Sequence, residues 1–565
     1  MSGRGGALSG RAAPLFYRTE DLSQAVQYNV MRENAPARTP RFGVLRLSAP
    51  ALIVACALFL PFLNKAYLID DPYFLLQAQQ ITHEFLRPMN FTICWFDNCA
   101  CSPAYRLAPG AALMGYVLFP VIQFAALESV VHLVQLLTLL AALVATVSLA
   151  LRWGAGRFEA GAAAMLLATF PPVLALTDTA MPDVLAMSLA VIGIERFSAW
   201  LEDGRIPSAT VAALALGLAP FARLHAIGMI GLAFVMAATT PRTRPARRWL
   251  DVLPLLAAAA LFLALSLVTR EPGSAGPLPP ASRISAVTAG DNTRSLLSYY
   301  ILCFPVAVMW LLSQRRRAVW LIAYAAAAYL IFLALARQGI LASGISCMAA
   351  VSALSIAHLL WRGARRRSRE LLLGAWLLAP CVAIPYLHLP PKYLMLSAPA
   401  AAIAGVALLR GESPAFRRTA LAAFIAVGAV ASVLILTADA RFADMSRQAS
   451  ADLVAPHVAK GERVWFTGEW GLYWYAQKAG ARVVMAGASE PKPGDLLIAG
   501  KQDGGAPVLE RFPRRTLMEE RVFAWTGGRT MSLPYRAGLY SNSWGPLPWS
   551  WGSGEVDRFQ LWRID

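Results

Sequence analysis

Two adjacent carboxylates, Asp70 and Asp71, follow the first long apolar segment of the chain, in the sequence Leu68-Ile-Asp-Asp-Pro-Tyr-Phe74. A carboxylate beside hydrocarbon costs free energy unless it faces water or a partner, so this position indicates a role in chemistry. The alternative is a structural role, because Asp before Pro and an apolar run is a common start of a helix. The two residues by themselves leave both interpretations open.

Further polar residues stand at the ends of other apolar segments, where a helix would leave the membrane. They are Asp178 and Asp183, Arg223 and His225, and Lys392 and Tyr393. A single charged residue at a helix end is most often an interfacial anchor with its charge in water. Taken together with the acidic pair, these residues instead predict a site at the outer membrane surface, with carboxylates for base catalysis and cations for a phosphate.

The composition requires that membrane helices position these residues. The chain has 565 residues, of which 57% are hydrophobic and 15% charged, and its mean hydropathy is +0.51. Repeated apolar runs of roughly 18 to 22 residues match the hydrocarbon thickness of a bilayer. We therefore predict a polytopic α-helical membrane protein with about 13 transmembrane helices, and not a soluble enzyme.

The net charge of +18 does not predict nucleic-acid binding, because the arginines cluster in short hinges between apolar runs. The positive-inside rule places these hinges in the cytoplasm. They lie at residues 152–157, 242–248, 315–317, 362–369 and 410–418. This topology requires residues 110–127, which Pro120 interrupts, to form an interfacial or re-entrant helix and not a full crossing.

The chain then divides into three parts. Residues 1–46 are a cytoplasmic tail, residues 47–437 a transmembrane domain with a large first outer loop at 65–129, and residues 438–565 a domain on the same side as that loop. This last part predicts a small α/β domain, with strands near 461–466, 481–485 and 495–499 and a helix at 472–478. Its aromatic residues would stack on sugar rings or anchor the domain at the membrane interface. They are Tyr540, Trp544, Trp549, Trp551, Phe559 and Trp562.

The first outer loop carries three of the seven cysteines, Cys94, Cys99 and Cys101. Three cysteines allow one disulfide in an oxidising compartment, and a reduced set is the alternative. No histidine stands at metal-ligand spacing near them, and the chain has no phosphate-binding loop or zinc-protease motif. The sequence therefore implies no cofactor with certainty and leaves a divalent metal open.

The order of the polar motifs resembles that of the GT-C membrane glycosyltransferases. It runs from the Asp-Asp pair through Ser102-Pro103, Met181-Pro-Asp183 and Arg223 to the segment Lys392-Tyr-Leu-Met-Leu-Ser-Ala-Pro399. The chain is most similar to the bacterial branch related to protein O-mannosyltransferases and lipid A aminoarabinose transferases, and is thus glycosyltransferase family 39-like. The resemblance covers the chain from Leu47 through the last crossing. No single motif is specific to this family, but the order of the motifs is.

The resemblance implies sugar transfer at the periplasmic face of the bacterial inner (plasma) membrane, with inversion in a single displacement. The donor would be a hexose or pentose on a polyprenyl phosphate, and the acceptor a hydroxyl group of a lipid, a glycan or a protein. In such enzymes a carboxylate of the first outer loop acts on the acceptor. This role maps to Asp70 as the base, with Asp71 as helix cap and acceptor contact and Asp183 as a further catalytic acid.

The resemblance also assigns the basic residues. Arg223, Lys392 and Tyr393 would bind the donor phosphate, and Asp178, His225 and Arg106 would support the site. The family usually has Lys where this chain has Arg223, and Arg where it has Lys392, so both charges are kept. The family's Asn-Pro-Pro or His-Pro-Pro appears here as Cys101-Ser-Pro-Ala104.

Two other classes of protein remain alternatives. A transporter or flippase for a lipid-linked envelope precursor would also have many crossings and buried charges, but it would be expected to show duplicated halves with broken helices, which this sequence does not display. A membrane scaffold whose tail binds an envelope partner would explain the aromatic C-terminus. It would not explain the ordered outer charges.

Overall fold

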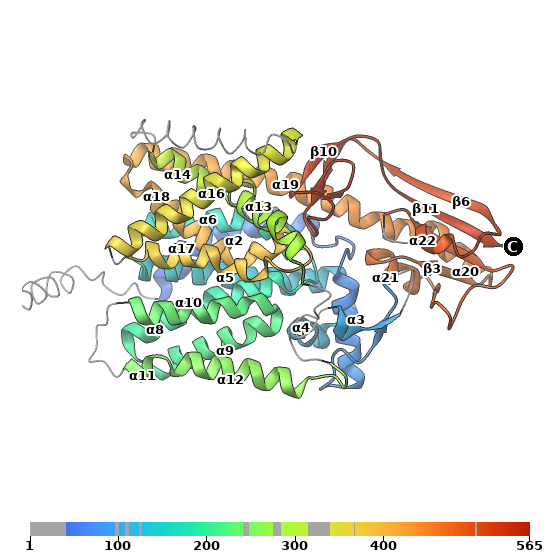
Figure 1. The fold of residues 1–565 in the computed structure, drawn as a ribbon, viewed down its shortest axis with the longest axis horizontal. Helices are drawn as coiled ribbons and strands as arrows, with labels where there is room; N and C mark the ends of the chain where they lie inside the picture. Colours follow the sequence, from blue (N-terminus) through green and yellow to red (C-terminus); the bar gives the residue numbers. More distant parts are fainter. Residues whose placement is uncertain are drawn as a thin grey trace, which may run out of the picture. The chain divides into compact units, whose positions relative to one another are not determined.

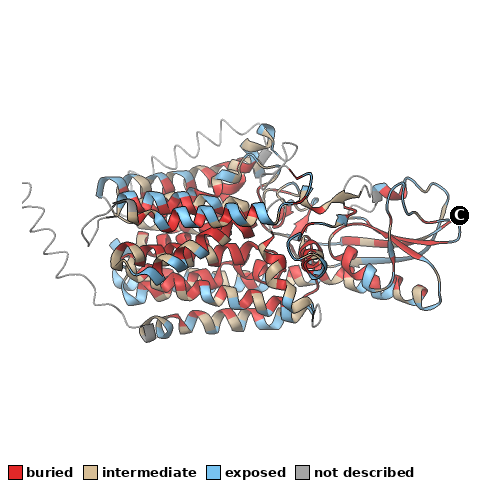
Figure 2. Cartoon of the chain, turned by 90° about the horizontal axis from the view of Figure 1, so that it is seen from below, coloured by how far each residue is buried: buried red, intermediate tan, exposed pale blue. Residues whose placement is uncertain are grey.

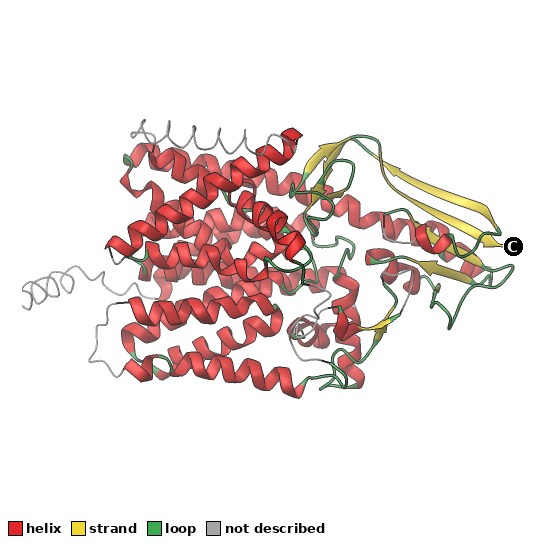
Figure 3. Ribbon diagram, viewed as in Figure 1, coloured by secondary structure: helices red, strands yellow, loops and turns green. Residues whose placement is uncertain are grey.

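The computed structural model describes residues 41–565 apart from 96–100, 108–111, 124–126, 241–247, 275–283, 315–338, 367 and 503–505. The chain divides after Val44, and the larger unit is Leu45–Asp565. Helices make up most of this unit, and strands gather in its C-terminal part (Figure 3). Residues 1–40 of the tail expected at 1–46, Cys99, residues 242–247 of the hinge at 242–248 and the hinge at 315–317 lie outside the described residues. Residues 41–46 of the expected tail already belong to the first helix.

Six helices of the described residues are long and apolar enough to cross a membrane. They are Gly43–Phe62, Glu128–Arg152, Asp183–Asp203, Leu341–Arg366, Pro391–Gly411 and Pro414–Ala459. Two bent helix pairs, Arg157–Thr169 with Pro171–Thr177 and Ala286–Leu302 with Val306–Gln314, raise the number to eight if each pair is one span. Five apolar helices of 10–17 residues accompany them. The protein is thus the expected polytopic helical membrane protein, while the number of about 13 crossings stays a prediction.

The described membrane part is built from α-helices and 3-10 helices, many of which Figure 1 labels. In chain order they are α2 (Arg41–Phe59), η1 (Leu60–Phe62), α5 (Glu128–Arg152), α6 (Arg157–Thr169), α7 (Pro171–Thr177), α8 (Asp183–Asp203), α9 (Ile206–Ala222), η4 (Leu224–Ala226), α10 (Ile227–Thr239), α11 (Arg248–Asp251), α12 (Leu253–Val268), α13 (Ala286–Leu302), α14 (Val306–Gln314), α16 (Gly339–Arg366), α17 (Glu370–Leu378), η7 (Ala379–Ala383), η8 (Pro391–Ser397), α18 (Ala398–Leu408), η9 (Leu409–Gly411) and α19 (Pro414–Leu453).

Small residues let these helices approach one another closely. A Cβ atom on Gly217 of α9 would lie 2.8 Å from the carbonyl oxygen of Ala258 in α12, and one on Gly428 of α19 would lie 2.6 Å from that of Thr169 in α6. Exposed residues line the outer helix faces (Figure 2). Many of them are apolar, such as Val427, which is 68% exposed. Lipid tails are as apolar as these side chains, so close packing and not water exclusion holds such helices together.

The first outer loop has its own short elements: α3 (Asp71–His83), β1 (Thr92–Ile93), β2 (Ser102–Pro103), η3 (Ala104–Arg106) and α4 (Leu113–Ile122). β1 and β2 pair antiparallel, and a disulfide between Cys94 and Cys101 closes this hairpin. The structure therefore selects the disulfide from the two alternatives. At 10 residues, α4 has a length of about 15 Å, half the hydrocarbon thickness of a bilayer, which agrees with a helix that does not cross.

The C-terminal part begins after a helix that continues past the expected boundary at residue 438. α19 extends to Leu453, and α20 (Ala455–Ala459) follows. Three expected strands and one expected helix then appear as β3 (Val464–Thr467), α21 (Trp470–Lys478), β4 (Arg482–Val483) and β5 (Leu496–Gly500). The further elements are α22 (Ala506–Leu509), β6 (Arg515–Ala524), β7 (Gly527–Arg529), β8 (Met531–Ser532), β9 (Ala537–Gly538), β10 (Ser550–Gly552) and β11 (Glu555–Ile564).

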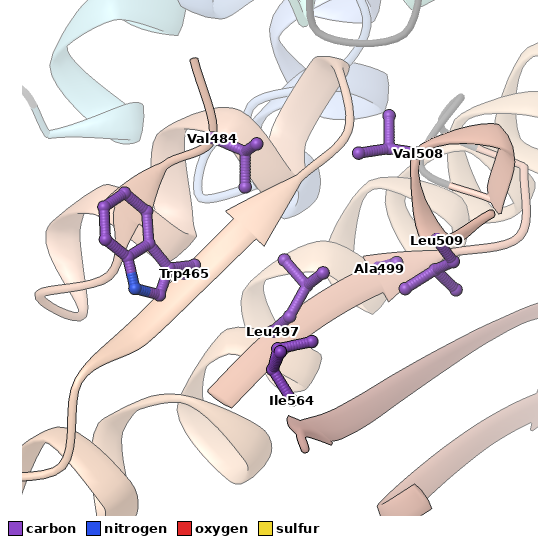
Figure 4. Packing of buried hydrophobic residues seen from close by; sticks show 7 residues of the cluster. All are labelled: Trp465, Val484, Leu497, Ala499, Val508, Leu509 and Ile564. Atoms are coloured by element: carbon purple, nitrogen blue, oxygen red, sulfur yellow. The ribbon is translucent and has the colours of Figure 1, made fainter. Parts of the chain in front are cut away.

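A five-stranded mixed sheet in the order β4-β3-β5-β11-β6 forms the centre of this part. β3 pairs in parallel with β4 and β5, whereas β11 pairs antiparallel with β5 and β6. Its core contains Trp465, Val484, Leu497, Ala499, Val508, Leu509 and Ile564 (Figure 4). Two of the aromatic residues considered for sugar stacking or membrane anchoring, Tyr540 and Phe559, are instead buried in the protein, each with 1% exposure.

Candidate active site

Asp70 lies in a tight turn between the first span and α3. Backbone hydrogen bonds from Asp71 N to Leu68 O at 2.9 Å and from Tyr73 N to Asp70 O at 3.1 Å hold this turn. Ile69 at its centre has a φ of +49°, a left-handed conformation that a β-branched residue rarely adopts. Such strain persists only where the surroundings impose it, often at functional sites. The turn fixes the backbone from which the Asp70 side chain extends.

Asp71 is fully buried and holds that turn in place. Its Oδ2 accepts a hydrogen bond from Leu68 N at 2.8 Å, and its Oδ1 accepts one from Ala180 N at 2.7 Å. We expected Asp71 to cap α3 and to contact an acceptor. The structure corrects the first expectation, because Asp70 occupies the N-cap position, while the carboxylate of Asp71, which is 0% exposed, is used by two buried N–H groups. The acceptor contact stays a prediction.

Asp70 pairs with Lys392, which lies 322 residues further along the chain. Lys392 Nζ is 2.7 Å from Asp70 Oδ2, and the side chains are 4% and 34% exposed, respectively. Burial favours a raised pKa for Asp70, but Lys392, with Arg223 and His388, outweighs burial and lowers this pKa below its usual value. Asp70 is therefore an ionised carboxylate that solvent reaches, held by a covered lysine.

A second ion pair joins Asp183 to Arg223. Arg223 Nη2 is 2.6 Å from Asp183 Oδ2, and the two side chains are 10% and 1% exposed, respectively. The guanidinium carbon lies 5.9 Å from the ring centre of Phe74 and 5.8 Å from that of Tyr393, at cation–π distance. In the described part of the chain, Arg223 Nε and Asp183 Oδ1 are buried without a hydrogen-bond partner. An unused buried donor on a cation is suited to an anionic ligand.

The residues of both pairs stand where helices begin or end. α8 starts at Asp183, directly after Pro182 at its N-cap. α9 ends at Ala222, and Arg223 then has extended backbone angles that take it off the helix axis. Lys392 lies in the first turn of η8, which begins at Pro391. Proline directly before or at the first helical position explains both helix starts.

His225 and Tyr393 complete this group. Their ring centres are 5.0 Å apart, and the ring centre of His388, which the sequence analysis did not single out, lies 6.3 Å from that of Tyr393. Arg106, expected as a supporting residue, is exposed at the end of η3. None of the contacts that connect the two ion pairs includes it.

Asp178 belongs to a different group, which we call the Lys65 cluster: Lys65, His132, Asp178, Asp439 and Tyr540. Lys65 Nζ is 2.8 Å from Asp439 Oδ2 and 3.9 Å from Asp178 Oδ2. His132 Nδ1 is 3.2 Å from Asp178 Oδ1, and the Tyr540 hydroxyl donates to Asp439 Oδ2 at 2.6 Å. The cluster is buried and connects the first outer loop, α5, α19 and the C-terminal part.

Most of this cluster was not predicted from the sequence. One signal was present, because Asp439 directly follows the uncharged, largely apolar run at 419–438 of α19, where a charge beside hydrocarbon requires a partner. Burial raises the pKa of Asp178 to about 8 and that of Asp71 to about 7, although Lys65 opposes both shifts. The pKa of Lys65 is raised, because its carboxylate neighbours outweigh burial. The single positive charge of Lys65 thus lies among three carboxyl groups, those of Asp71, Asp178 and Asp439, and cannot neutralise all of them.

The two ion pairs together provide a carboxylate open to solvent and two cations behind it. This set suits proton abstraction from a hydroxyl group and stabilisation of a phosphate. Among the residues that the structure describes, no group of three His, Cys, Asp or Glu side chains is placed to hold a metal ion.

No protein-family model and no curated protein matches the sequence. The structure is similar to the crystal structure of ArnT from Cupriavidus metallidurans bound to undecaprenyl phosphate, with a TM-score of 0.50 and 14% sequence identity, over 85% of this chain and 96% of that chain. The chain has a GT-C-like fold. The archaeal oligosaccharyltransferase AglB from Archaeoglobus fulgidus, in complex with an inhibitory peptide and a dolichol-phosphate, matches with a TM-score of 0.48 and 13% identity, over 85% of this chain and 73% of that chain.

The fold expected from the order of the motifs is therefore confirmed. In this GT-C-like fold, four segments that are far apart in the sequence supply the two ion pairs. They contribute Asp70, Asp183, Arg223 and Lys392.

Proposed function

We propose that this protein is a glycosyltransferase that moves a sugar from a polyprenyl phosphate to an acceptor hydroxyl group at the periplasmic face of a bacterial inner membrane. The observation that carries the proposal is the Asp70–Lys392 pair, a partly exposed carboxylate bound to a buried cation. The GT-C-like fold supports it, because ArnT from Cupriavidus metallidurans, which has a similar fold, was crystallised with undecaprenyl phosphate. A sugar linked to such a lipid phosphate would reach the site from within the membrane.

Lys392 and Arg223 are the proposed ligands of the donor phosphate. Both side chains are largely buried, so their attraction for an anion is weakly screened by water. Arg223 also keeps an unused Nε–H. Asp183 accepts a hydrogen bond from Nη2 of the same guanidinium group, so we assign it a positioning role. Tyr393 and His225 pack around that group.

Asp70 is the proposed general base. It takes the proton of the acceptor hydroxyl group while the oxygen attacks the anomeric carbon of the sugar. The bond between that carbon and the phosphate oxygen breaks, and its electron pair leaves with the lipid phosphate. Lys392 and Arg223 stabilise the charge that develops on this leaving group.

The Asp70–Lys392 pair also indicates how the donor prepares the base. A phosphate that binds Lys392 competes with Asp70 for the same ammonium group. Asp70 then loses the partner that lowers its pKa, and burial raises its basicity. Donor binding would thus switch Asp70 from an ion-pair partner to a base.

An assay of the purified protein in nanodiscs tests this proposal. Synthetic undecaprenyl phosphates that carry a hexose or a pentose are incubated with the protein and a cell-envelope extract as the acceptor source, and released undecaprenyl phosphate is measured by mass spectrometry. We expect release from at least one donor. No release from any donor, together with no binding of undecaprenyl phosphate, would overturn the proposed function.

The variant D70N tests the base in the same assay. We expect turnover to fall by about a hundred- to ten-thousand-fold, the usual contribution of a general base. Undecaprenyl phosphate should bind at least as tightly as to the wild type, because Lys392 no longer pairs with a carboxylate. D291N is the matched control, since the Asp291 side chain is 70% exposed. Wild-type turnover by D70N would exclude Asp70 as the base.

A further inference from the structure

One turn of the C-terminal part contacts the loop directly before η8, which we call the Lys392 loop (residues 384–390). We call this turn the Asn542 turn, residues 538–545. Leu389 N donates a hydrogen bond to Asn542 Oδ1 at 2.8 Å, across 153 residues of sequence. Beside it, Ser541 Oγ lies 3.3 Å from His388 Nδ1. The C-terminal part therefore binds the Lys392 loop only a few residues before the lysine.

The Asn542 turn is itself rigidly held. Gly538 N donates to Leu547 O at 2.7 Å, and Leu539 N donates to Thr530 O at 2.9 Å. Gly545 has a φ of +156°, and a Cβ atom there would lie 2.1 Å from a backbone oxygen, so only glycine fits. The Tyr540 hydroxyl group in the same turn is bound to Asp439 of the Lys65 cluster. The turn is therefore a fixed support for Asn542.

Both polar atoms of the Asn542 side-chain amide form hydrogen bonds. Its Nδ2 donates to Asn292 Oδ1 of α13 at 3.0 Å. Asn292 Nδ2 in turn donates to Ile384 O at 2.9 Å and to Tyr386 O at 2.6 Å. Two asparagines thus bind the Lys392 loop at three backbone positions, two of them through Asn292. These side-chain bonds add to backbone bonds of the same loop, such as those from Tyr386 N to Ala383 O at 3.0 Å and from Ser285 N to Pro385 O at 2.8 Å, so its backbone is held at several points.

The link from Leu389 to Lys392 is short and stiff. Only Pro390 and Pro391 lie between them. Each proline fixes its own φ, and each restricts the residue before it, so Leu389, Pro390 and Pro391 have little freedom. A displacement of Leu389 is therefore passed on to Lys392, whose ammonium group lies 2.7 Å from Asp70.

We infer that Asn542 is a positioning residue for Lys392, and that the C-terminal part is in this way a component of the donor-phosphate site. The inference rests on the proposed function. Asn542 does not touch the donor; it acts through Leu389 and the two prolines. If Asn542 only held two parts of the protein together, its loss would reduce stability and would affect all ligand contacts alike.

The test measures binding of undecaprenyl phosphate to the purified full-length protein in nanodiscs. We expect N542A to weaken binding by about tenfold, the effect of one or two lost hydrogen bonds on the position of the lysine. S543A is the matched control, because the neighbouring Ser543 is exposed and should leave the affinity unchanged. The melting temperature of each variant is measured in the same nanodiscs, and N542S is measured alongside in case N542A does not accumulate.

A double variant separates positioning from a general structural role. If Asn542 acts only through Lys392, N542A should weaken binding in the wild type but cause no further loss in K392A. An equal loss in both backgrounds, or wild-type affinity of N542A, would overturn the inference while the proposed function stands. Failure of the wild-type protein to bind undecaprenyl phosphate would overturn both.

Discussion

Asp70 and Asp71 are sequence neighbours with opposite surroundings. Asp70 keeps 34% of its side chain exposed and pairs with a lysine, whereas Asp71 is fully buried and accepts two backbone hydrogen bonds. Adjacent side chains at the start of a helix point in different directions, so one can face the site while the other faces the protein. The two residues therefore differ in what their replacement should change.

D71N should reduce stability and leave the chemistry in place. The Asn amide nitrogen cannot accept a hydrogen bond, so one of the two buried N–H groups loses its partner, at a cost of about 1 to 3 kcal/mol. We expect a lower melting temperature in nanodiscs. The turnover per folded molecule should fall by much less than about a hundredfold, which is the smallest loss expected for D70N. A D71N protein that melts like the wild type but does not turn over would assign the base to Asp71.

The pH dependence of kcat/KM tests the Asp70–Lys392 pair. The acid limb of this profile reports the pKa of the base in the free enzyme. Because Lys392 lowers the pKa of Asp70, the acid limb of the wild type should lie below pH 3.8. In K392A the effect of burial is no longer opposed by this lysine, so the acid limb should move to higher pH. K392R keeps a cation and should keep the limb low. An unmoved limb in K392A would show that Lys392 does not control the base.

At the scale of elements, the Lys65 cluster ties segments that the sequence keeps far apart. Lys65 and Asp439 are 374 residues apart, yet both are buried against each other. α21 adds to this junction, since a Cβ atom on Gly471 would lie 2.6 Å from Tyr67 O of the first outer loop. The first loop, α19 and the C-terminal part thus form one packed junction whose charges respond to pH.

Asp178 should make this junction less stable as the pH rises. Its pKa of about 8 in the folded protein exceeds the usual 3.8, so the folded state binds more protons than the unfolded state between these values. Stability therefore falls as the pH increases from about 4 to about 8. D178N removes this contribution. The melting temperature of D178N minus that of the wild type should therefore be higher at pH 8.5 than at pH 5.5. D291N should show no such difference, and a parallel pH response of D178N and wild type would refute the assignment.

At the scale of the whole molecule, the membrane part and the C-terminal part meet directly before Lys392. Leu389, two residues before the candidate span that begins at Pro391, donates a hydrogen bond to Asn542 of the C-terminal part. This arrangement requires the first outer loop and the C-terminal part to lie on the same side of the membrane. The basic hinges should then lie on the other side.

Cysteine labelling of whole cells tests this topology. In a background in which the free cysteines are replaced, T82C in the first outer loop should react with a membrane-impermeant maleimide, because Thr82 is exposed. R365C in the hinge at 362–369 should react only after the cells are permeabilised. Reaction of both positions in intact cells would refute the predicted orientation.

The sequence by itself determined the class of the protein and the residue types of its site. Long apolar runs dictate membrane helices, because the length of a run and its hydropathy are local properties. The three first strands and one helix of the C-terminal part followed from local patterns in the same way. Asp70, Asp183, Arg223, Lys392 and Tyr393 could be proposed because charges at the ends of apolar runs are costly without a function.

Only the tertiary structure decided which of these residues meet. The sequence treated Asp178 like Asp183, but the packing of α5, α7 and α19 places Asp178 at Lys65, and the packing of α8 against α9 places Asp183 at Arg223. It gave no sign of the Asn542 turn, because an asparagine between serines is ordinary in any loop. Pairings across hundreds of residues depend on how helices pack, and that packing is set by many small contacts spread along the whole chain, not by any local pattern.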